Sequence, residues 1–416
     1  MVVTPGNPGM PGQAPGSHPV SITDVPPEGI EAGLFVVGPE APLVDGLADR
    51  LRANGAMVFG PGADGAQLEG SKAFMKELLE EARVPTARFG IFDDLQAAKA
   101  FLADLPGPWV VKTDGLAAGK GVLVTQDLSE AEADVEAKLS GAAFGDAGRR
   151  VVIEEGLSGP ECSLLALCDG RRVVPLPLAQ DHKRAGDGDT GQNTGGMGAY
   201  SPLPFDITGD LEKLTDRVLD ESVDPLVSAL RRRGVDYRGV LYAGIMLTAE
   251  GPKVLEYNVR FGDPEAQVVL PRINDDLTAL LAEAASGNLR TEPAIAGDAA
   301  ICVVLAAEGY PGVPRAGDAI EGLDRAAVVE GVTVLHAGTR LDSKGRVVTA
   351  GGRVLGVTAT GPELDVAARR AYRGVSCIGW PGMHFRKDIG AAAMSSGRER
   401  SAASDASRAE GTEQSR

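Results

Sequence analysis

Apolar and polar residues follow two periods in the first part of the chain, one typical of buried strands and one typical of helices. Short apolar runs at 33–38 and 57–61 predict two buried strands, and the amphipathic stretch 42–54 between them predicts a helix. Residues 71–82 carry apolar side chains at helical spacing, and Pro85 ends that segment. A strand, a helix and a strand in this order predict an α/β amino-terminal region.

A second group of predicted elements surrounds a glycine-rich loop at 114–121. A strand at 109–113 runs into this loop and a β-branched strand at 122–125 follows it, whereas a helix follows a Walker-type phosphate loop. We therefore expect a flap between two antiparallel strands. The neighbouring pattern predicts helices at 94–105 and 129–139, a strand at 150–154 and a strand meander over 163–178.

The rest of the chain predicts a third group of elements and a tail. The polar, glycine-rich stretch 179–202 is too long for an ordinary connection, and we interpret it as a functional loop. From Ala299 a strand-rich block begins, and the tail after Gly390 has little to bury, so we expect it to be disordered. The remaining predictions are helices at 210–232, 277–286 and 363–373, a strand pair at 239–248 and 253–260, and a hairpin over 346–360.

These patterns predict a multidomain protein of mixed α/β and α+β class. We expect an α/β domain at 1–70, a central domain at 71–294, a strand-rich carboxy-terminal domain at 295–390 and the tail at 391–416. Within the central domain, residues 108–178 form the smaller part that carries the flap.

Composition narrows the function classes further. The 416 residues carry a net charge of −17, which argues against general binding to the phosphate backbone of nucleic acid, because such binding needs clustered Lys and Arg. No apolar run approaches the roughly 18 residues of a membrane helix. Four isolated cysteines and the absence of a basic, apolar leader indicate a cytoplasmic protein without disulfides. These cysteines are Cys162, Cys168, Cys302 and Cys377.

The flap is the first candidate for chemistry. Its closely spaced backbone amides and Lys120 suit a triphosphate, and Lys112 and Lys72 supply two further cations nearby in the predicted fold. The alternative is an ordinary glycine-rich hairpin loop with solvated lysines. The strand that starts at Val151 runs out through acids, a geometry in which backbone groups pair with adenine and Glu161 binds ribose. Its alternative is a strand that ends in charged turn residues.

The segment 253–267 is the most informative one. Side chains alternate along a strand, so Glu256, Asn258 and Arg260 point to one face. A carboxylate and an amide oxygen are hard donors that suit Mg²⁺. The alternative is the solvent face of a half-buried strand, but residues 261–264, Phe-Gly-Asp-Pro, place these side chains at a strand end, where α/β proteins carry their sites.

Seven sequence blocks in this order resemble the ATP-grasp superfamily, and within it the phosphoribosylamine–glycine ligase (glycinamide ribonucleotide synthetase) family. The blocks lie at 38–43, 68–74, 112–121, 180–184, 193–202, 260–267 and 386–390. The resemblance implies an ATP-grasp fold with a Rossmann-like amino-terminal domain. It also implies that ATP phosphorylates glycine and that the amine of 5-phosphoribosylamine attacks the glycyl phosphate, with Mg²⁺ or Mn²⁺ as metal. We expect a monomer with these small molecules as its partners.

The resemblance also assigns roles to residues. Nucleotide binding falls to Lys72, Lys112, Gly115, Gly119, Lys120, Gly121, Glu154, Glu155, Leu157 and Glu161. Substrate binding falls to Glu40, Asp181, Lys183, Arg184, Gly195, Gly196, Gly198 and Asp263. Catalysis falls to Arg260, Lys112 and Lys183, and the metal to Glu256 and Asn258. His182 is expected to be structural or to contact substrate.

The amino terminus departs from the family pattern. Family members begin with a further strand and a Gly-x-Gly-Gly-Arg-Glu-His loop, and this chain starts after that point, so we expect a truncated first domain with an exposed sheet edge. A misplaced start or a damaged phosphoribosylamine site explains this, and we favour the former. The chain as written is then expected to bind Mg-ATP and to make little product. The alternatives are another ATP-grasp ligase and a nucleotide-binding remnant without turnover.

Overall fold

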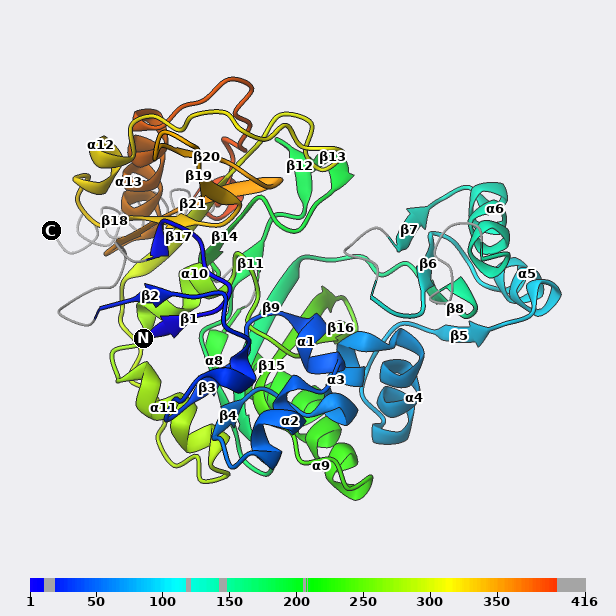
Figure 1. Ribbon diagram of the computed structural model, residues 1–416. Helices are drawn as coiled ribbons and strands as arrows, with labels where there is room; N and C mark the ends of the chain where they lie inside the picture. The colour runs from blue at the N-terminus through cyan, green and yellow to red at the C-terminus, as the bar shows by residue number, and fades with distance from the viewer. Residues whose placement is uncertain (11–18, 117–120, 142–147, 205–206, 208, 395–416) are drawn as a thin grey trace, which may run out of the picture.

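The computed structural model describes residues 1–10, 19–116, 121–141, 148–204, 207 and 209–394. A large body holds both ends of the described chain, and a smaller unit made of β5–β8, α5 and α6 stands apart on one side of it (Figure 1). Strands β6 and β7 of the small unit flank the glycine-rich loop, of which residues 117–120 lie outside the described ranges.

The amino-terminal region contains two small parallel strand pairs, β1–β2 and β3–β4. The helix predicted over 42–54 is interrupted, because Gly46 adopts a left-handed φ of 78° between α1 and α2. The short α3 was not predicted. β3 pairs only with β4 among the described residues, and its Val36 is 48% exposed. The elements are β1 Val2–Val3, β2 Ser21–Ile22, β3 Phe35–Val36, α1 Glu40–Val44, α2 Leu47–Ala53, β4 Val58–Phe59 and α3 Ala63–Gly70.

The small unit is an antiparallel four-stranded sheet covered by two helices. Its strand order is β5-β8-β6-β7, and the predicted flap strands pair as β6 and β7. Helix α4 Lys72–Ala82 leads into this unit; the side chain of Ser71 accepts from the N–H of Phe74 and caps it, as the predicted boundary requires. The elements are β5 Phe89–Phe92, α5 Leu95–Asp104, β6 Trp109–Thr113, β7 Val122–Thr125, α6 Leu128–Leu139 and β8 Val151–Glu155.

The central part of the body is a second antiparallel sheet of order β10-β9-β15-β16. The helix predicted over 210–232 is α8 and α9, joined by a π-helical turn at Leu219–Val223. The elements are β9 Glu161–Asp169, β10 Val173–Pro175, α8 Leu211–Val218, α9 Asp224–Arg232, β15 Arg238–Thr248, β16 Gly251–Asn258, α10 Ala266–Val269 and α11 Leu277–Ala285.

The third sheet joins the carboxy-terminal region to the stretch 179–202. That stretch was predicted as a loop, but it forms β11 to β14, and β14 pairs with β17 in the order β11-β14-β17-β21-β18. The hairpin predicted over 346–360 is wrong, because β20 pairs with β19 while β21 lies between β17 and β18. The elements are β11 Gln180–Asp181, β12 Arg184–Gly186, β13 Thr190–Asn193, β14 Gly198–Ser201, β17 Ala299–Ala306, α12 Leu323–Ala327, β18 Val332–His336, β19 Thr339–Leu341, β20 Val347–Thr349, β21 Arg353–Gly361 and α13 Leu364–Cys377.

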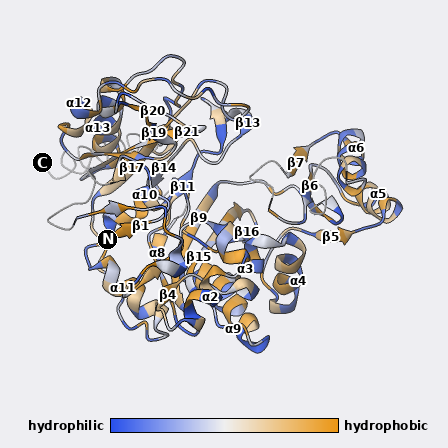
Figure 2. Ribbon diagram, viewed as in Figure 1, coloured by the Kyte–Doolittle hydropathy of each residue, from blue (hydrophilic) through white to orange (hydrophobic). Residues whose placement is uncertain are grey.

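Separate hydrophobic cores hold these units together. The small unit has its own cluster, which includes Leu102, Val111 and Ile153, whereas three other clusters fill the body. Hydrophobic positions gather around β15 and α9, while β13 is hydrophilic (Figure 2). The small unit therefore packs internally by burial of its own apolar surface.

Candidate active site

A buried cluster of three charges joins the small unit to α4. The carboxylate of Glu154 on β8 lies 2.8 Å from Nζ of Lys112 and 2.9 Å from Nζ of Lys76, and Glu154 is 2% exposed. Burial alone raises the pKa of the Glu154 carboxyl, but the two ammonium groups outweigh burial and hold this pKa below its ordinary value. Lys76 was missed by sequence reasoning, because a lysine on a helix is ordinarily solvated.

Asp114 fastens the start of the glycine-rich loop to the start of α4. One of its carboxylate oxygens accepts from the hydroxyl of Ser71 at 2.8 Å and from the N–H of Ala73 at 3.1 Å. The other oxygen accepts from Arg150 at 2.7 Å. The loop base is thus fixed by the helix N-terminus and by one arginine.

Lys72 faces this loop base. Its Nζ lies 3.5 Å from the carbonyl oxygen of Gly115, and burial lowers the pKa of Lys72. Gly121 rejoins the strand pairing, since the N–H of Thr113 donates to its carbonyl at 2.9 Å. The predicted nucleotide residues Gly119 and Lys120 lie outside the described residues.

Two of the acids predicted for the nucleotide lie at the adjoining ends of β8 and β9. Glu155 ends β8 and accepts from the N–H of Arg88 at 2.9 Å, and Leu157 follows it in the connection to β9. Glu161 begins β9 and lies 2.7 Å from Nζ of Lys183. The strand end predicted to hold nucleotide is therefore next to a residue predicted for catalysis.

Lys183 lies in a half-buried, mixed-charge cluster, in which its side chain is 35% exposed. Burial lowers its pKa, but Asp181 and Glu161 outweigh burial, so the pKa of Lys183 lies well above its ordinary value. Burial, with Asp181 as the next cause, raises the pKa of Glu265 to about 7. The hydroxyl of Tyr242 donates to Glu265 at 2.9 Å. Glu265 was quoted in a sequence block but given no role, and Tyr242 was missed.

Glu256 and Asn258 share one face of β16, with the buried Tyr257 between them on the other face, as the alternation predicts. A Cβ on Gly244 of the paired strand would lie 3.3 Å from Cγ of Glu256, so the glycine keeps room for this side chain. Nζ of Lys112 donates to the carbonyl of Leu255 at 3.3 Å, which brings the flap strand against this pair.

Glu256 is the meeting point of the predicted cations. Burial alone raises the pKa of its carboxyl, but four cations outweigh burial and keep this pKa below its ordinary value. They are, in decreasing effect, Lys183, Lys112, Lys72 and Arg260. The carboxylate is thus ionised at neutral pH, and the side chains of Glu256 and Asn258 make no hydrogen bond or ion pair in the portion of the chain that is described.

This donor pair fits Mg²⁺ or Mn²⁺ bound together with phosphate. Among the described residues there is no group of three or more His, Cys, Asp or Glu side chains that would form an all-protein metal site. Mg²⁺ typically takes one or two protein oxygens and completes its shell with waters and substrate phosphates. The ionised carboxylate of Glu256 and the amide oxygen of Asn258 would supply the two protein oxygens, and the surrounding lysines would attract the phosphates that complete the shell.

Arg260 is held by two carboxylates from the amino-terminal region. Its guanidinium lies 2.8 Å from Glu69 and 3.4 Å from Glu40, which was itself predicted for substrate. Glu69 also accepts from the N–H of Val259 at 2.9 Å, and burial raises its pKa to about 7. Glu69 lies in a quoted block, but sequence reasoning gave it no role.

The carboxy-terminal region reaches the site through Arg353. Its guanidinium donates to the carbonyl oxygens of Gly195 and Asp263, both at 2.6 Å, and binds the Asp263 carboxylate at 3.0 Å. A Cβ on Gly196 would lie 2.4 Å from Cδ of Pro264, so this glycine is required for the close approach of the two loops. The Asp263 carboxylate is therefore already paired, and Arg353 was missed.

The other residues of the 180–198 stretch have structural partners. Arg184 donates to the carbonyl of Gly191 at 2.9 Å, and Gly198 lies in β14, where a Cβ would be 2.6 Å from the carbonyl oxygen of Cys302. His182 accepts from the N–H of Gly390 at 3.2 Å, and burial lowers its pKa. The structural alternative predicted for His182 agrees with these contacts.

The comparisons with known proteins agree with this geometry. Models of the phosphoribosylglycinamide synthetase N domain, ATP-grasp (A) domain and C domain match residues 1–69, 70–266 and 300–392. The N-domain match does not show that a unit is missing from the amino terminus. No helix within the described ranges has the length and apolar character needed to cross a membrane.

Relatives extend the match over most of the chain. Phosphoribosylamine–glycine ligase from Streptomyces coelicolor is 52% identical over 366 residues, which is 87% of this chain and 84% of that protein. The chloroplastic enzyme of Arabidopsis thaliana is 50% identical over 86% of this chain and 67% of its own length.

Solved structures support the fold. The crystal structure of phosphoribosylamine–glycine ligase from Thermotoga maritima superposes with a TM-score of 0.79 at 33% identity, covering 93% of each chain. The biotin carboxylase domain of Hydrogenobacter thermophilus 2-oxoglutarate carboxylase, solved with MgADP, has a TM-score of 0.67 at 20% identity over 88% of this chain and 82% of its own. This chain belongs to the phosphoribosylglycinamide synthetase family, the ATP-grasp phosphoribosylamine–glycine ligases of purine biosynthesis.

Proposed function

We propose that this chain catalyses the family reaction at the face of β16 that presents Glu256 and Asn258, with the cations around Glu256. In that reaction ATP phosphorylates the carboxylate of glycine, and the amine of 5-phosphoribosylamine displaces phosphate to give glycinamide ribonucleotide. The observation that carries the proposal is the convergence of four cations from separate segments on one partly buried, ionised carboxylate. Such a site neutralises phosphate charge, which is most of what phosphoryl transfer demands of a protein.

Lys112 and Lys72 are proposed to bind the phosphates of ATP. Lys112 is fixed by Glu154 and by the carbonyl of Leu255, so little side-chain freedom is lost when it binds. Lys72 lies at the N-terminus of α4, where the helix dipole adds further positive potential. The backbone ends of β8 and β9, with Glu155, Leu157 and Glu161, are proposed to receive adenine and ribose.

Glu256 and Asn258 are proposed to hold Mg²⁺ or Mn²⁺. When bound there, the metal would supply positive charge to the phosphate oxygens. The protein contribution is to present an ionised carboxylate and an amide oxygen from one strand face at a fixed spacing. The bound MgADP of the biotin carboxylase relative is consistent with this cofactor class.

Arg260 and Lys183 are proposed to orient the reacting carboxylate. Glu69 fixes the guanidinium of Arg260, and Glu161 fixes Lys183, so both cations are positioned before substrate arrives. A cavity of about 560 Å³ lies between β7 and the β12–β13 hairpin and is lined in part by Arg184 and Asn193. We propose that phosphoribosylamine enters through this cavity, with Arg184 as the cation nearest its phosphate.

The proposed location of the protein is a reducing compartment. All four cysteines are free thiols, which suits a reducing compartment such as the cytoplasm, although one relative is chloroplastic. We propose that the chain acts as a monomer.

Replacement of Glu256 tests the proposal. Glu256→Gln keeps the volume and removes the charge, and we expect at least a hundred-fold loss of kcat/KM for ATP that higher Mg²⁺ only partly restores. Glu250→Gln, on the exposed turn of the same strand pair, is the matched control and should retain full activity. The readout is ADP release with glycine and phosphoribosylamine both present, and with each omitted.

Two results contradict the proposal. One is an active Glu256→Gln variant with an unchanged Mg²⁺ requirement, and the other is ADP release that needs neither co-substrate. Formation of glycinamide ribonucleotide by the chain as written also decides whether its amino-terminal region suffices for the reaction, against the expectation of little product.

A further inference from the structure

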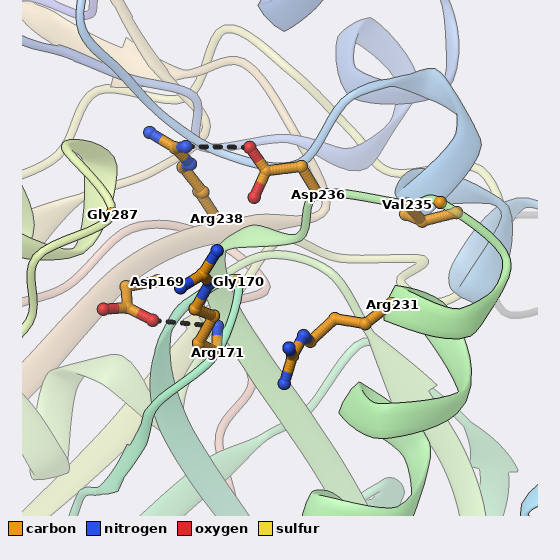
Figure 3. A pocket seen from close by; sticks show the side chains of 9 residues that line it. Asp169, Gly170, Arg171, Arg231, Val235, Asp236, Arg238 and Gly287 are labelled. Atoms are coloured by element: carbon orange, nitrogen blue, oxygen red, sulfur yellow. Dashed lines mark hydrogen bonds and ion pairs between the residues drawn. The ribbon is translucent and has the colours of Figure 1, made fainter.

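An arginine-lined cavity of about 460 Å³ lies at the other end of β9 and β15 from the reaction site (Figure 3). β9 starts at Glu161 beside Lys183 and ends at Asp169, which is paired with Arg238 at the start of β15. Four residue steps along β15, at about 3.4 Å each, lead from Arg238 to Tyr242. The cavity is thus distinct from the cluster around Glu256.

Both acids that line this cavity already have hydrogen-bond or ion-pair partners. Asp169 accepts from the N–H groups of Arg171 at 2.9 Å, Arg172 at 2.7 Å and Leu289 at 2.9 Å. Asp236 forms an ion pair with Arg238 at 2.9 Å. Neither carboxylate is therefore free to pair with the other cations of the cavity.

Two arginines of the cavity have no acidic partner. The side chains of Arg171 and Arg231 make no hydrogen bond or ion pair with any other described residue. They come from different segments, the turn after β9 and helix α9 (Figure 3). Unmatched guanidinium groups around one hollow suit bidentate recognition of phosphate oxygens.

Arg238 adds a fixed third cation. Besides its ion pair with Asp236, it donates to the carbonyl of Ala285 at 3.1 Å. Its buried Nε has no hydrogen-bond partner among the residues described, and such an orphaned donor calls for an ordered water or a ligand oxygen.

Glycines keep the hollow open. Gly170 and Gly287 adopt left-handed φ values of 93° and 73°. A Cβ on Gly170 would lie 2.4 Å from Oδ1 of Asp236, and one on Gly287 would lie 3.0 Å from Cζ of Arg238. Side chains at these positions would collide with the ion pair that shapes the cavity.

We propose that this cavity binds a small phosphate compound with two or more negative charges. With two acids and three arginines in its lining, the cavity carries a net positive charge. The whole chain has a net charge of −17 and does not attract anions in general, so binding of an anion here would depend on these arginines. Of the described residues that line it, Val235 has the one apolar side chain, and none has an aromatic ring on which a base would stack. The favoured ligands are therefore pyrophosphate or a sugar phosphate, recognised through phosphate oxygens.

Titration calorimetry with pyrophosphate, in metal-free buffer, tests the site, and ribose 5-phosphate in a parallel series distinguishes the two sources of phosphate. We expect saturable binding of at least one probe that weakens ten-fold or more in the double variant Arg171→Gln/Arg231→Gln. The matched control is Arg232→Gln, the next residue on α9, which is 58% exposed and lies outside the cavity lining. It should bind like the unmodified chain.

A variant of the reaction site separates this proposal from the previous one. Lys112→Gln should leave the arginine-dependent binding unchanged, because Lys112 belongs to the cluster around Glu256. The proposal is overturned if neither probe binds saturably, if the double variant binds like the unmodified chain, or if Lys112→Gln alone abolishes binding.

Discussion

Replacement of Glu154 by Gln tests whether charge, and not apolar contact, anchors the small unit. Glu154 is the only acid that touches Lys76 and Lys112 within hydrogen-bond distance among the described residues. Lys76 is 0% exposed and Lys112 is 7% exposed. The substitution keeps the shape of the side chain and leaves two buried ammonium groups without a counter-charge.

The size of the effect follows from burial. Removing one partner of a buried ion pair costs roughly 3–5 kcal/mol, because the remaining charge loses its compensation. Burial already lowers the pKa of Lys76 to about 8, so its ammonium form depends on Glu154. Lys76→Met in the Glu154→Gln background removes one orphaned charge, and the double variant should recover at least about 1 kcal/mol.

Trp109 reports on the relevant unit. It lies on β6, three residues before Lys112, and its indole N–H donates to the carbonyls of Leu102 at 3.0 Å and Leu105 at 2.9 Å. The chain has two tryptophans, so Trp380→Phe leaves Trp109 as the only indole fluorophore. Urea unfolding followed by this fluorescence gives the free energy of unfolding of each variant.

An exposed pair in the same unit supplies the control. Lys99 and Glu136 lie 3.3 Å apart on α5 and α6, with side chains 30% and 61% exposed. Glu136→Gln should cost no more than about 1 kcal/mol. The reasoning fails if Glu154→Gln costs no more than this control, or if the double variant is as unstable as the sum of the single variants.

Two further predictions concern Glu69 and Arg353. The pKa of Glu69 is about 7 in the fold and 4.5 ordinarily, so its contribution to stability is fully present below pH 4.5 and is lost as the pH rises through 7. That difference in pKa corresponds to roughly 3 kcal/mol. Glu69→Gln should therefore flatten the dependence of the unfolding free energy on pH between 4.5 and 7. An unchanged slope in the variant refutes this role of Glu69. Arg353→Gln should raise KM for phosphoribosylamine at least ten-fold with little change in KM for ATP, because Arg353 positions the loops at Gly195 and Asp263. Steady-state kinetics with each substrate varied checks this, and equal changes in both KM values contradict it.

Local pattern was sufficient for much of the fold. Helix α4 begins directly after Ser71, the first residue of the helix predicted over 71–82, and α5, α6 and α11 begin after Asp94, Asp127 and Asp276, whose carboxylates accept from the first-turn N–H groups. The period of two also placed Glu256 and Asn258 on one face of β16. These features depend on neighbours a few residues apart, so a sequence window contains their cause.

The errors arose where distant segments decide the pairing. The sequence of β20 and β21 resembles a hairpin because glycines separate the two strands. In the structure β21 pairs with β17, and β20 pairs with β19 instead. Arg260 meets Glu69 and Glu40 across 191 and 220 residues of sequence. Tyr242, Lys76 and Arg353 were missed for the same reason, since each gains its partner only when separate units pack together.

Lys112 helps to attach the small unit to the body, and the same residue is proposed to bind the phosphates of ATP. The apolar cluster of this unit does not extend into the body, so its polar attachments are Glu154 with Lys76 and Lys112, and Asp114 with the start of α4. Lys112 also reaches the carbonyl of Leu255 on the strand that carries Glu256. Phosphates bound near Lys112 would therefore compete with Glu154 for one ammonium group, and any gain in phosphate contact is offset by weaker attachment of the unit. Lys76 limits that loss, because it stays within 2.9 Å of Glu154 while Lys112, still held by the carbonyl of Leu255, shares its charge with phosphate.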